Sequence, residues 1–363
     1  MDSIDKYKGC LIAGAIGDAL GYPIEFLNEK KIFSSYGEKG LTEFDTVNGI
    51  AQISDDTQMS MFTANGLLVA ATISKIKREK PKYVKCIADS YKDWLITQSE
   101  SFSSHSKGNN SWLLNESRLF SSREPGHTCL SAILSGSNGT IADPINNSKG
   151  CGGIMRVAPI GLFFSSKYHS FEEIDKLAAE SSALTHGHDL GYMPSAVVAH
   201  IISLVSHDDD ISLISAVRSA KSFVEELFKD KEHIGELIAL IDKAIELSQK
   251  DIDDLEAIHL LGEGWVAEET LAIALYCSLK YSNDIQKALI VSVNHKGDSD
   301  STGAVTGNIL GAYLGYEKIP QKYLDELELK DVILELASDL YNGSHMSTLD
   351  YLNDKSWLVK YYH

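Results

Sequence analysis

Aspartates occur in three short segments that lie far apart in the chain, and in two of these segments they adjoin Ser or Thr. These segments are Gly17–Gly21, which contains Asp18, then Ser54–Thr57 and Gly297–Gly303. Crowded carboxylates repel one another unless a cation lies between them, and hard oxygen ligands suit Mg²⁺, Mn²⁺ or Ca²⁺ rather than zinc. The last two segments could supply four carboxylates to one site, enough for two ions. This pattern predicts a metal-dependent enzyme.

The segment Ser54-Asp55-Asp56-Thr57 precedes an apolar-periodic stretch that continues through Val69 and predicts a helix. Ser or Asp at a helix start satisfies free N–H groups and favours the positive helix end. An ordinary N-cap therefore accounts for one or both aspartates. Equally, the two side chains can diverge, so that one caps the helix and the other reaches a metal.

Asp298 and Asp300 are alternate residues, and we expect them in a tight turn before a helix that begins at Gly303. This spacing can bring both carboxylates to one cation, although a solvated acidic turn is the alternative. The following helix has a face of small residues, and so does the helix expected over Ile4–Leu20. We expect these faces to pack closely, which would bring Asp18 beside Asp298; the residues are Gly303, Ala304, Gly307, Gly311 and Ala312 on one side, and Gly9, Ala13, Gly14 and Gly17 on the other.

Glu25 lies between Ile24 and Phe26, so its carboxylate could be partly desolvated and act as a base or a gate. For Asp18 we favour a structural role, in capping a neighbouring helix or accepting bonds from backbone amides.

A glycine-rich loop, Gly150–Gly153, runs into Ile154-Met155-Arg156. Free N–H groups in such a loop can hold phosphate oxygens, but the Lys-Ser/Thr ending of a P-loop is missing, and a flexible surface loop is the alternative. Cys151 in this loop has no implied His–Asp pair and is discounted as a nucleophile. His186 and His188 could bind zinc, but no third soft ligand is evident, so hydrogen bonding to substrate or a neighbouring loop is favoured.

Most of the chain has the apolar periodicity of helices, strand-like alternation is rare, and there are only seven prolines among 363 residues. With 44% hydrophobic residues, the chain can form a large core. Nothing resembles an interdomain linker. We therefore expect one all-α domain over residues 1–363. The expected helices are Ile4–Leu20, the stretch after Thr57, Ile174–Leu184, Ser195–Val205, Ser212–Phe228, Ile234–Ser248, Ala267–Leu279, Ile285–Asn294, Gly303–Leu314 and Leu329–Tyr341.

The formal charge is −18, from 33 Lys and Arg against 51 Asp and Glu. This balance disfavours general binding to nucleic acid or to anionic membranes, but it still allows a local basic pocket for a phosphorylated ligand. The five cysteines are scattered without a CxxC pair, which disfavours a disulfide framework and fits a reducing compartment. The N-terminus shows no signal peptide, and no apolar run looks long enough to span a bilayer. We therefore expect a cytoplasmic protein with no nucleic-acid or membrane partner.

In combination, these segments resemble the ADP-ribosylglycohydrolase family, of the kind that includes the dinitrogenase-reductase-activating glycohydrolases. Each matching piece is weak alone, but seven occur in the family's order and span nearly the whole chain. They are Gly9–Gly21, Ser54–Met59, Arg123–Thr128, Lys149–Pro159, Thr185–His188, Gly264–Thr270 and Gly297–Ala304.

The resemblance implies a compact orthogonal helical bundle with two Mg²⁺ or Mn²⁺ ions in a cleft. It implies metal ligation by Ser54, Asp55, Asp56, Asp298, Asp300 and Ser301, and catalytic roles for Glu25, as a gating glutamate, and for Asp55 and Asp300. The diphosphate of ADP-ribose would lie on Gly150, Cys151, Gly152 and Gly153, with Met155 and His186 also binding substrate and Glu124 and His127 facing the acceptor.

Four positions depart from the family's pattern. Ser54 and Ser301 stand where many members have Thr, and either hydroxyl can ligate a metal. His127 stands where many have Asn, and Glu124 where some have Asp. The last two changes lie in the acceptor-facing loop, so they leave the linkage specificity open.

The resemblance implies hydrolysis of the N-glycosidic bond between ADP-ribose and a protein side chain, with an arginine linkage favoured over serine. The implied partner is an ADP-ribosylated protein, with a cognate ADP-ribosyltransferase as a further candidate. Two rival functions remain. One is an immunity or binding protein that occludes an ADP-ribosyltransferase, and the other is a Mg²⁺-dependent hydrolase of nucleotide diphosphates.

Overall fold

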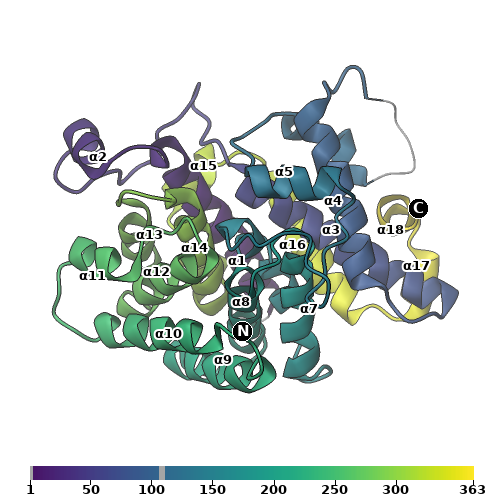
Figure 1. The fold of residues 1–363 in the computed structure, drawn as a ribbon. Helices are drawn as coiled ribbons and strands as arrows, with labels where there is room; N and C mark the ends of the chain where they lie inside the picture. The colour runs from purple at the N-terminus through teal and green to yellow at the C-terminus, as the bar shows by residue number, and fades with distance from the viewer. Residues whose placement is uncertain (1–2, 106–110) are drawn as a thin grey trace.

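The computed structural model describes residues 3–105 and 111–363. Within these two ranges the chain forms 18 α-helices and five short 3-10 helices, and its only β-structure is three isolated bridges. This confirms the expected all-α class. Figure 1 shows α1, α8 and α14 in the middle of the molecule, with α9–α13 on one side and α3, α4, α17 and α18 on the other. That the whole chain is one domain stays a prediction.

The longer helices run in chain order as follows: α1 Ser3–Gly21, α2 Glu29–Tyr36, α3 Asp55–Lys77, α4 Tyr83–Ser99, α5 His127–Leu134, α6 Ala158–Phe163, α7 Phe171–Ala183, α8 Asp189–His207, α9 Leu213–Leu227, α10 Ile234–Ser248, α11 Asp254–Leu261, α12 Ala267–Lys280, α13 Ile285–Val293, α14 Ser299–Leu314, α15 Gln321–Glu326, α16 Lys330–His345, α17 Thr348–Asn353 and α18 Lys355–Tyr361. The 3-10 helices are η1 Tyr22–Ile24, η2 Trp112–Asn115, η3 Ser117–Leu119, η4 Cys151–Gly153 and η5 Tyr316–Lys318.

All ten expected helices are present, but α8 begins six residues earlier than the sequence pattern predicts and α14 begins four residues earlier. Its N-cap is Asp298, whose Oδ1 accepts a hydrogen bond from the N–H of Ser301 at 3.1 Å. Because an aspartate at this position satisfies a free N–H of the first turn, the helix starts at Ser299 rather than Gly303. The expectation that Asp298 and Asp300 lie in a tight turn is therefore wrong: they belong to a helix start.

Helix α4 was not among the helices expected from the sequence. Its buried residues Ile87, Tyr91 and Trp94 recur at helical spacing, so the pattern is present in the sequence and was overlooked. This helix packs along α3.

The closest helix contact in the fold joins α1 to α14, as expected from their small-residue faces. A Cβ added at Gly17 would lie 2.0 Å from the carbonyl oxygen of Gly303, and one added at Gly307 would lie 2.0 Å from that of Ala13. Only glycine allows the two backbones to approach this closely. Figure 1 shows the two helices side by side in the centre. The N-terminus of α14 is thereby placed beside the C-terminal end of α1.

Two helices, α3 and α8, are long and apolar enough to cross a membrane by length and composition alone. The expectation that no apolar segment is long enough to span a bilayer is therefore wrong for these two helices. In the fold, 78% and 89% of their apolar windows are buried inside the protein. Their hydrophobic surface is thus used in helix packing.

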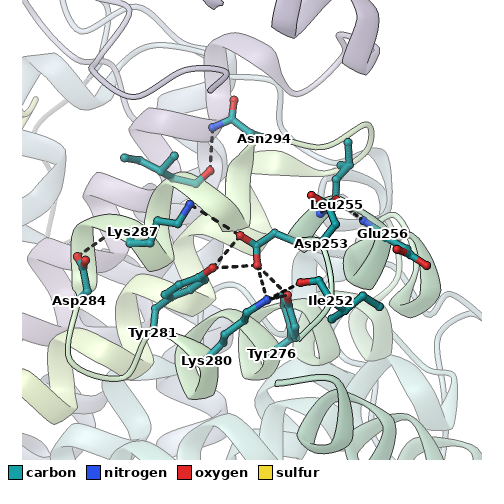
Figure 2. Close-up of polar contacts among 12 residues, drawn as sticks. Ile252, Asp253, Leu255, Glu256, Tyr276, Lys280, Tyr281, Asp284, Lys287 and Asn294 are labelled. Carbon is teal, nitrogen blue, oxygen red and sulfur yellow. Dashed lines mark hydrogen bonds and ion pairs between the residues drawn. The ribbon is translucent and has the colours of Figure 1, made fainter. Parts of the chain in front are cut away.

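A polar cluster anchors α11 to its neighbours α12 and α13. Asp254 accepts hydrogen bonds of 2.8 Å from the hydroxyls of Tyr276 and Tyr281, and its carboxylate forms ion pairs with Lys280 at 2.9 Å and Lys287 at 3.8 Å. Figure 2 shows these tyrosines and lysines converging on one carboxylate. Because the charge is paired and hydrogen-bonded, the cluster holds a peripheral helix in place, and it leaves no polar group that invites a ligand.

We predict that Gly17→Ala destabilises the protein by about 2–3 kcal/mol, since the new methyl group must push α14 away. Gly235→Ala in α10 is the matched control, because nothing lies within 4 Å of an added Cβ there. Denaturant unfolding of both variants measures the difference. An equal effect of the two substitutions would show that the contact is not tight.

Candidate active site

The predicted carboxylates lie at the N-termini of two helices, α3 and α14. Ser54 caps α3 by accepting a hydrogen bond from the N–H of Asp56 at 3.2 Å, and Asp55 and Asp56 occupy the first turn. Asp298 caps α14, and Asp300 lies in its first turn. A helix N-terminus carries partial positive charge and stabilises nearby carboxylates. This partial positive charge offsets some of the free energy that is lost by burying the four acids close together.

Asp18, at the end of α1, fixes the start of α3. Its carboxylate accepts hydrogen bonds from the N–H groups of Ser54 at 2.9 Å and Thr57 at 3.1 Å, and from the Thr57 hydroxyl. The side chain is fully buried, and this burial raises its pKa to about 6 although these bonds oppose the shift. Asp18 therefore has the structural role that we favoured, and it joins α1 to α3.

A cavity of about 190 Å³ opens over these helix ends. Most of the predicted site residues line it, and so do four others, Gly126, Thr128, Cys129 and Trp265. The predicted residues in its wall are Glu25, Asp55, Asp56, Glu124, His127, Gly150, Cys151, Gly152, Met155, His186, Asp298, Asp300 and Ser301. The structure thus brings together segments from the first residues of the chain to residue 301.

Two predicted site residues, Ser54 and Gly153, lie outside the lining of this cavity. Ser54 is buried behind it, with its hydroxyl accepting from Asp56. The carbonyl of Gly153 accepts a hydrogen bond from the Ser182 hydroxyl at 2.9 Å, and an added Cβ would lie 3.0 Å from the carbonyl oxygen of Gly191. Gly153 therefore packs the loop against α7 and α8.

Three of the acids lie close enough together to bind one metal ion. Carboxylate oxygens of Glu25, Asp298 and Asp300 lie within 4.8 Å of one another, and all three residues are buried. Within residues 3–105 and 111–363, Glu25 Oε2 and Asp56 Oδ2 are buried without a hydrogen-bond partner. A buried polar oxygen without a partner costs free energy. A hard divalent cation is the kind of partner that such oxygens fit.

The same crowding shifts the ionisation of the cluster. Burial, followed by the charges of Asp298 and Asp55, raises the pKa of Glu25 to about 9. Burial also raises the pKa values of Asp56 and Asp300 well above their usual range, and neighbouring carboxylates add to the effect. Without a cation, the cluster therefore keeps protons that isolated carboxyl groups would release at neutral pH.

Cys151 and His186 also line the cavity, and both are neutral at physiological pH. The Cys151 thiol donates to Asp298 Oδ2 at 2.7 Å, and burial together with Asp298 raises its pKa well above normal. A protonated thiol is a poor nucleophile, which agrees with our discounting it. Burial, assisted by the charge of Arg156, lowers the pKa of His186 to about 3, so its imidazole can only exchange neutral hydrogen bonds.

The glycines of the loop allow its backbone to run close to these side chains. A Cβ added at Gly152 would lie 2.6 Å from Cys129 Sγ and 3.0 Å from the His186 ring. Glu124, which also lines the cavity, has a positive φ of 52° that non-glycine residues rarely adopt. Strained conformations of this kind cluster at functional sites.

Sequence reasoning missed an aromatic pair at the rim. Trp265 stacks on Phe26, with ring centroids 5.9 Å apart and planes 20° from parallel, and the two side chains are 39% and 66% exposed. Phe26 directly follows Glu25, so the pair joins the Glu25 segment to the loop before α12. Trp265 belongs to a segment that we matched to the family, but its exposure could not be inferred from that match.

The fold and site define an all-α protein with a buried carboxylate centre at two helix N-termini, facing a glycine-rich loop. Residues 1–349 match the family model described as ADP-ribosylglycohydrolase. The chain belongs to this family, whose members are hydrolases of ADP-ribose conjugates.

Among related proteins, an uncharacterized protein of Archaeoglobus fulgidus is 27% identical over 93% of this chain and 96% of its own length. Mouse ADP-ribosylhydrolase ARH3 is 26% identical, covering 93% of this chain and 92% of its own. The ADP-ribosylarginine hydrolase Tri1 of Serratia proteamaculans is 25% identical, covering 94% and 80%. A solved ADP-ribosylglycohydrolase-related protein complex shares the fold, with a TM-score of 0.61, 22% identity and coverage of 94% and 99%.

The raised pKa of Glu25 predicts how stability depends on pH in the absence of divalent cations. Its carboxyl group stabilises the fold below the unfolded pKa of about 4.5, and that contribution is lost as pH rises through about 9. Glu25→Gln should therefore raise the melting temperature in EDTA at about pH 9 by a few degrees, with little effect at about pH 5.

Glu38→Gln is the control, because Glu38 is exposed. Thermal unfolding at both pH values provides the comparison. A pH-independent effect of Glu25→Gln would contradict the electrostatic explanation.

Proposed function

We propose that this protein removes ADP-ribose from a modified protein side chain, with an arginine linkage favoured. The observation that carries the proposal is the group of buried acids under the cavity, with the unpartnered oxygens of Glu25 and Asp56 among them. Hydrolysis of a glycosidic bond needs acidic groups on both the leaving-group and the water side. The proposed partner is an ADP-ribosylated protein. Cytoplasmic location and the absence of nucleic-acid and membrane partners stay predictions.

We further propose that the site holds two Mg²⁺ or Mn²⁺ ions. Their ligands would come from the ends of α3 and α14: Ser54, Asp55, Asp56, Asp298, Asp300 and Ser301. The donor set supports this, because it consists of carboxylate and hydroxyl oxygens at helix starts. When bound, such ions supply Lewis-acid polarisation of the ribose hydroxyls and of an ordered water. A cognate ADP-ribosyltransferase remains a proposed additional partner.

The protein's own groups would divide the proton transfers. Glu25 holds a proton at neutral pH in the cation-free site, which suits it to protonate the departing nitrogen as the bond to C1″ breaks. Asp300 would accept a proton from the water that attacks C1″, with Asp55 held in position by the Gly126 N–H at 3.3 Å. The products would be free ADP-ribose and the unmodified side chain.

Binding of the diphosphate is proposed for the loop Gly150–Gly153, with Met155 beside it in the wall. His186, as a neutral imidazole, would exchange a hydrogen bond with the ribose or phosphate. Glu124 and His127 line the same cavity. An acid at the acceptor side favours a cationic leaving group, which supports arginine over serine.

Asp300→Ala should lower the release of free ADP-ribose by at least about a hundredfold, because it removes a ligand and a base together. The assay uses arginine- and serine-ADP-ribosylated proteins with Mg²⁺ or EDTA. Asp325→Ala, at an exposed position of α15, is the control. Activity that survives either EDTA or Asp300→Ala would exclude the two-metal mechanism.

The same assay separates the rival functions. Release of AMP or phosphate in place of ADP-ribose would indicate a nucleotide-diphosphate hydrolase. Tight binding to an ADP-ribosyltransferase without turnover would indicate an occluding protein. Preferential release from the serine-linked substrate would overturn the arginine assignment alone.

Metal binding has a readout independent of activity. Mg²⁺ or Mn²⁺ should raise the melting temperature of the protein by several degrees at saturating concentration, since ligand that binds only the folded state stabilises it. In Asp56→Asn this shift should shrink, whereas in Asp325→Asn it should persist. Equal shifts in the two variants would place the ion elsewhere.

A further inference from the structure

A second cavity, of about 540 Å³, lies between the C-terminal half of α3 and the start of α4. Its lining shares no residue with the cavity over the carboxylates. Asn65 is ten residues beyond Asp55 on the same helix, which separates the two sites by about 15 Å along α3. The volume lies in the range of small-molecule sites, about 300–1,000 Å³.

The charge around this cavity is opposite to that of the whole protein. Six of the eleven residues from Lys75 to Lys85 are basic, in a chain whose formal charge is −18. The lysines of the lining are Lys77, Lys80, Lys82, Lys85 and Lys92, and its acids are Glu79, Asp89 and Asp93. The cavity wall therefore carries an excess of positive charge.

Part of this charge is already paired. Asp89 forms ion pairs with Lys85 at 2.5 Å and Lys92 at 3.1 Å, and Asp93 accepts a hydrogen bond from the N–H of Ser111 at 3.0 Å. In the part of the chain that the structure describes, Lys77, Lys80 and Lys82 form no ion pair. Three cationic groups are therefore available to a ligand at the rim.

A basic cluster at the end of α3 has an ordinary explanation, because lysines favour the negative C-terminus of a helix. This explains Lys77, which lies in the last turn. It does not explain Lys82 and Lys85, which are the N-cap and the first turn of α4. Cations are unfavourable at a helix N-terminus, and this one has no acid in its first turn and no side-chain cap. An anion bound there would satisfy both the free N–H groups and the lysines.

The cavity wall also contains a buried polar group without a partner. Asn65 is 1% exposed, and its Nδ2 donates to the Ser90 hydroxyl at 2.7 Å. Its Oδ1 is buried and accepts no hydrogen bond from the described residues. Val69, Ala70 and Ile73 continue this wall along α3. The cavity thus combines a cationic rim, a free amide oxygen and an apolar side.

We propose that this cavity is a second ligand site, for a nucleotide-sized organic phosphate. The phosphates would lie on the N-terminus of α4 and on Lys77, Lys80 and Lys82. A hydroxyl or amino group of the ligand would donate to Asn65 Oδ1, and its less polar part would contact Val69 and Ile73. The site is separate from the hydrolytic centre and does not depend on the proposed activity.

Cys86 provides a reporter inside this cavity. Three of the other four cysteines are buried. Alkylation of each cysteine can be followed by peptide mass spectrometry at mildly alkaline pH, with ADP or inorganic pyrophosphate as the probe and EDTA present. Both probes should slow the alkylation of Cys86. Equilibrium binding by calorimetry gives the affinity in parallel.

The test variant is Lys80→Glu/Lys82→Glu, and the charge-matched control is Lys39→Glu/Lys318→Glu; all four lysines are exposed. The test variant should abolish protection of Cys86 and weaken its site at least about tenfold, which corresponds to about 1.4 kcal/mol. The control should behave as the unmodified protein. Release of ADP-ribose from the modified substrate, measured in parallel with Mg²⁺ present, reports the hydrolytic cavity, so failure of this proposal is distinguishable from failure of the proposed activity.

Absence of Cys86 protection by both probes, or protection that persists in Lys80→Glu/Lys82→Glu, would overturn the proposal. Asn65→Ala tests the amide contact, because ADP offers hydroxyl and amino donors that fully ionised pyrophosphate lacks. This variant should weaken ADP more than pyrophosphate. Equal weakening of the two probes would contradict the role of Asn65.

Discussion

The backbone contact between α1 and α14 is the constraint on which the site depends. A Cβ added at Gly17 or at Gly303 would collide with the carbonyl oxygen of the other glycine, so no side chain fits between them. This contact sets α14 beside the end of α1, where Asp18 holds the first turn of α3. The N-termini of two helices, separated by more than 200 residues in sequence, are thereby fixed next to each other.

Bringing two helix N-termini together creates a site that is both anionic and electrostatically supported. The helix ends favour the carboxylates of Asp55, Asp56 and Asp300. Their mutual repulsion and burial oppose ionisation, as the raised pKa values of Asp56 and Asp300 show. Without a bound cation the cluster therefore retains protons. Its carboxylate oxygens can act as ligands when a cation binds. A membership in the ADP-ribosylglycohydrolase family is consistent with such a centre.

The helix α3 connects two regions of opposite charge. Its first turn contributes acids to the carboxylate centre, and its last turn contributes Lys77 to the basic cavity. Both placements follow the helix dipole, with acids at the N-terminus and lysines at the C-terminus. The basic start of α4 does not follow this rule, and the proposed anionic ligand would account for that departure.

The sequence by itself determined the helical class and the small-residue faces of α1 and α14, because these are properties of residue type and spacing. It also identified most residues of the cavity wall, but several of them, among them Glu124, His127 and Met155, only through the resemblance to the ADP-ribosylglycohydrolase family. It misjudged the start of α14, because the cap formed by Asp298 extends the helix into a segment read as a turn. It also missed α4, although the apolar residues Ile87, Tyr91 and Trp94 have helical spacing.

Only the tertiary structure decided which polar atoms are left without partners. In the described part of the chain, Glu25 Oε2 and Asn65 Oδ1 are buried without a hydrogen-bond partner. The tertiary structure also decided the pKa of Glu25, which is raised by burial and by the charges of Asp298, Asp55, Glu124 and Asp18. Burial and electrostatic environment are sums over distant parts of the chain, so the linear order of residues identifies the groups but not their chemical state.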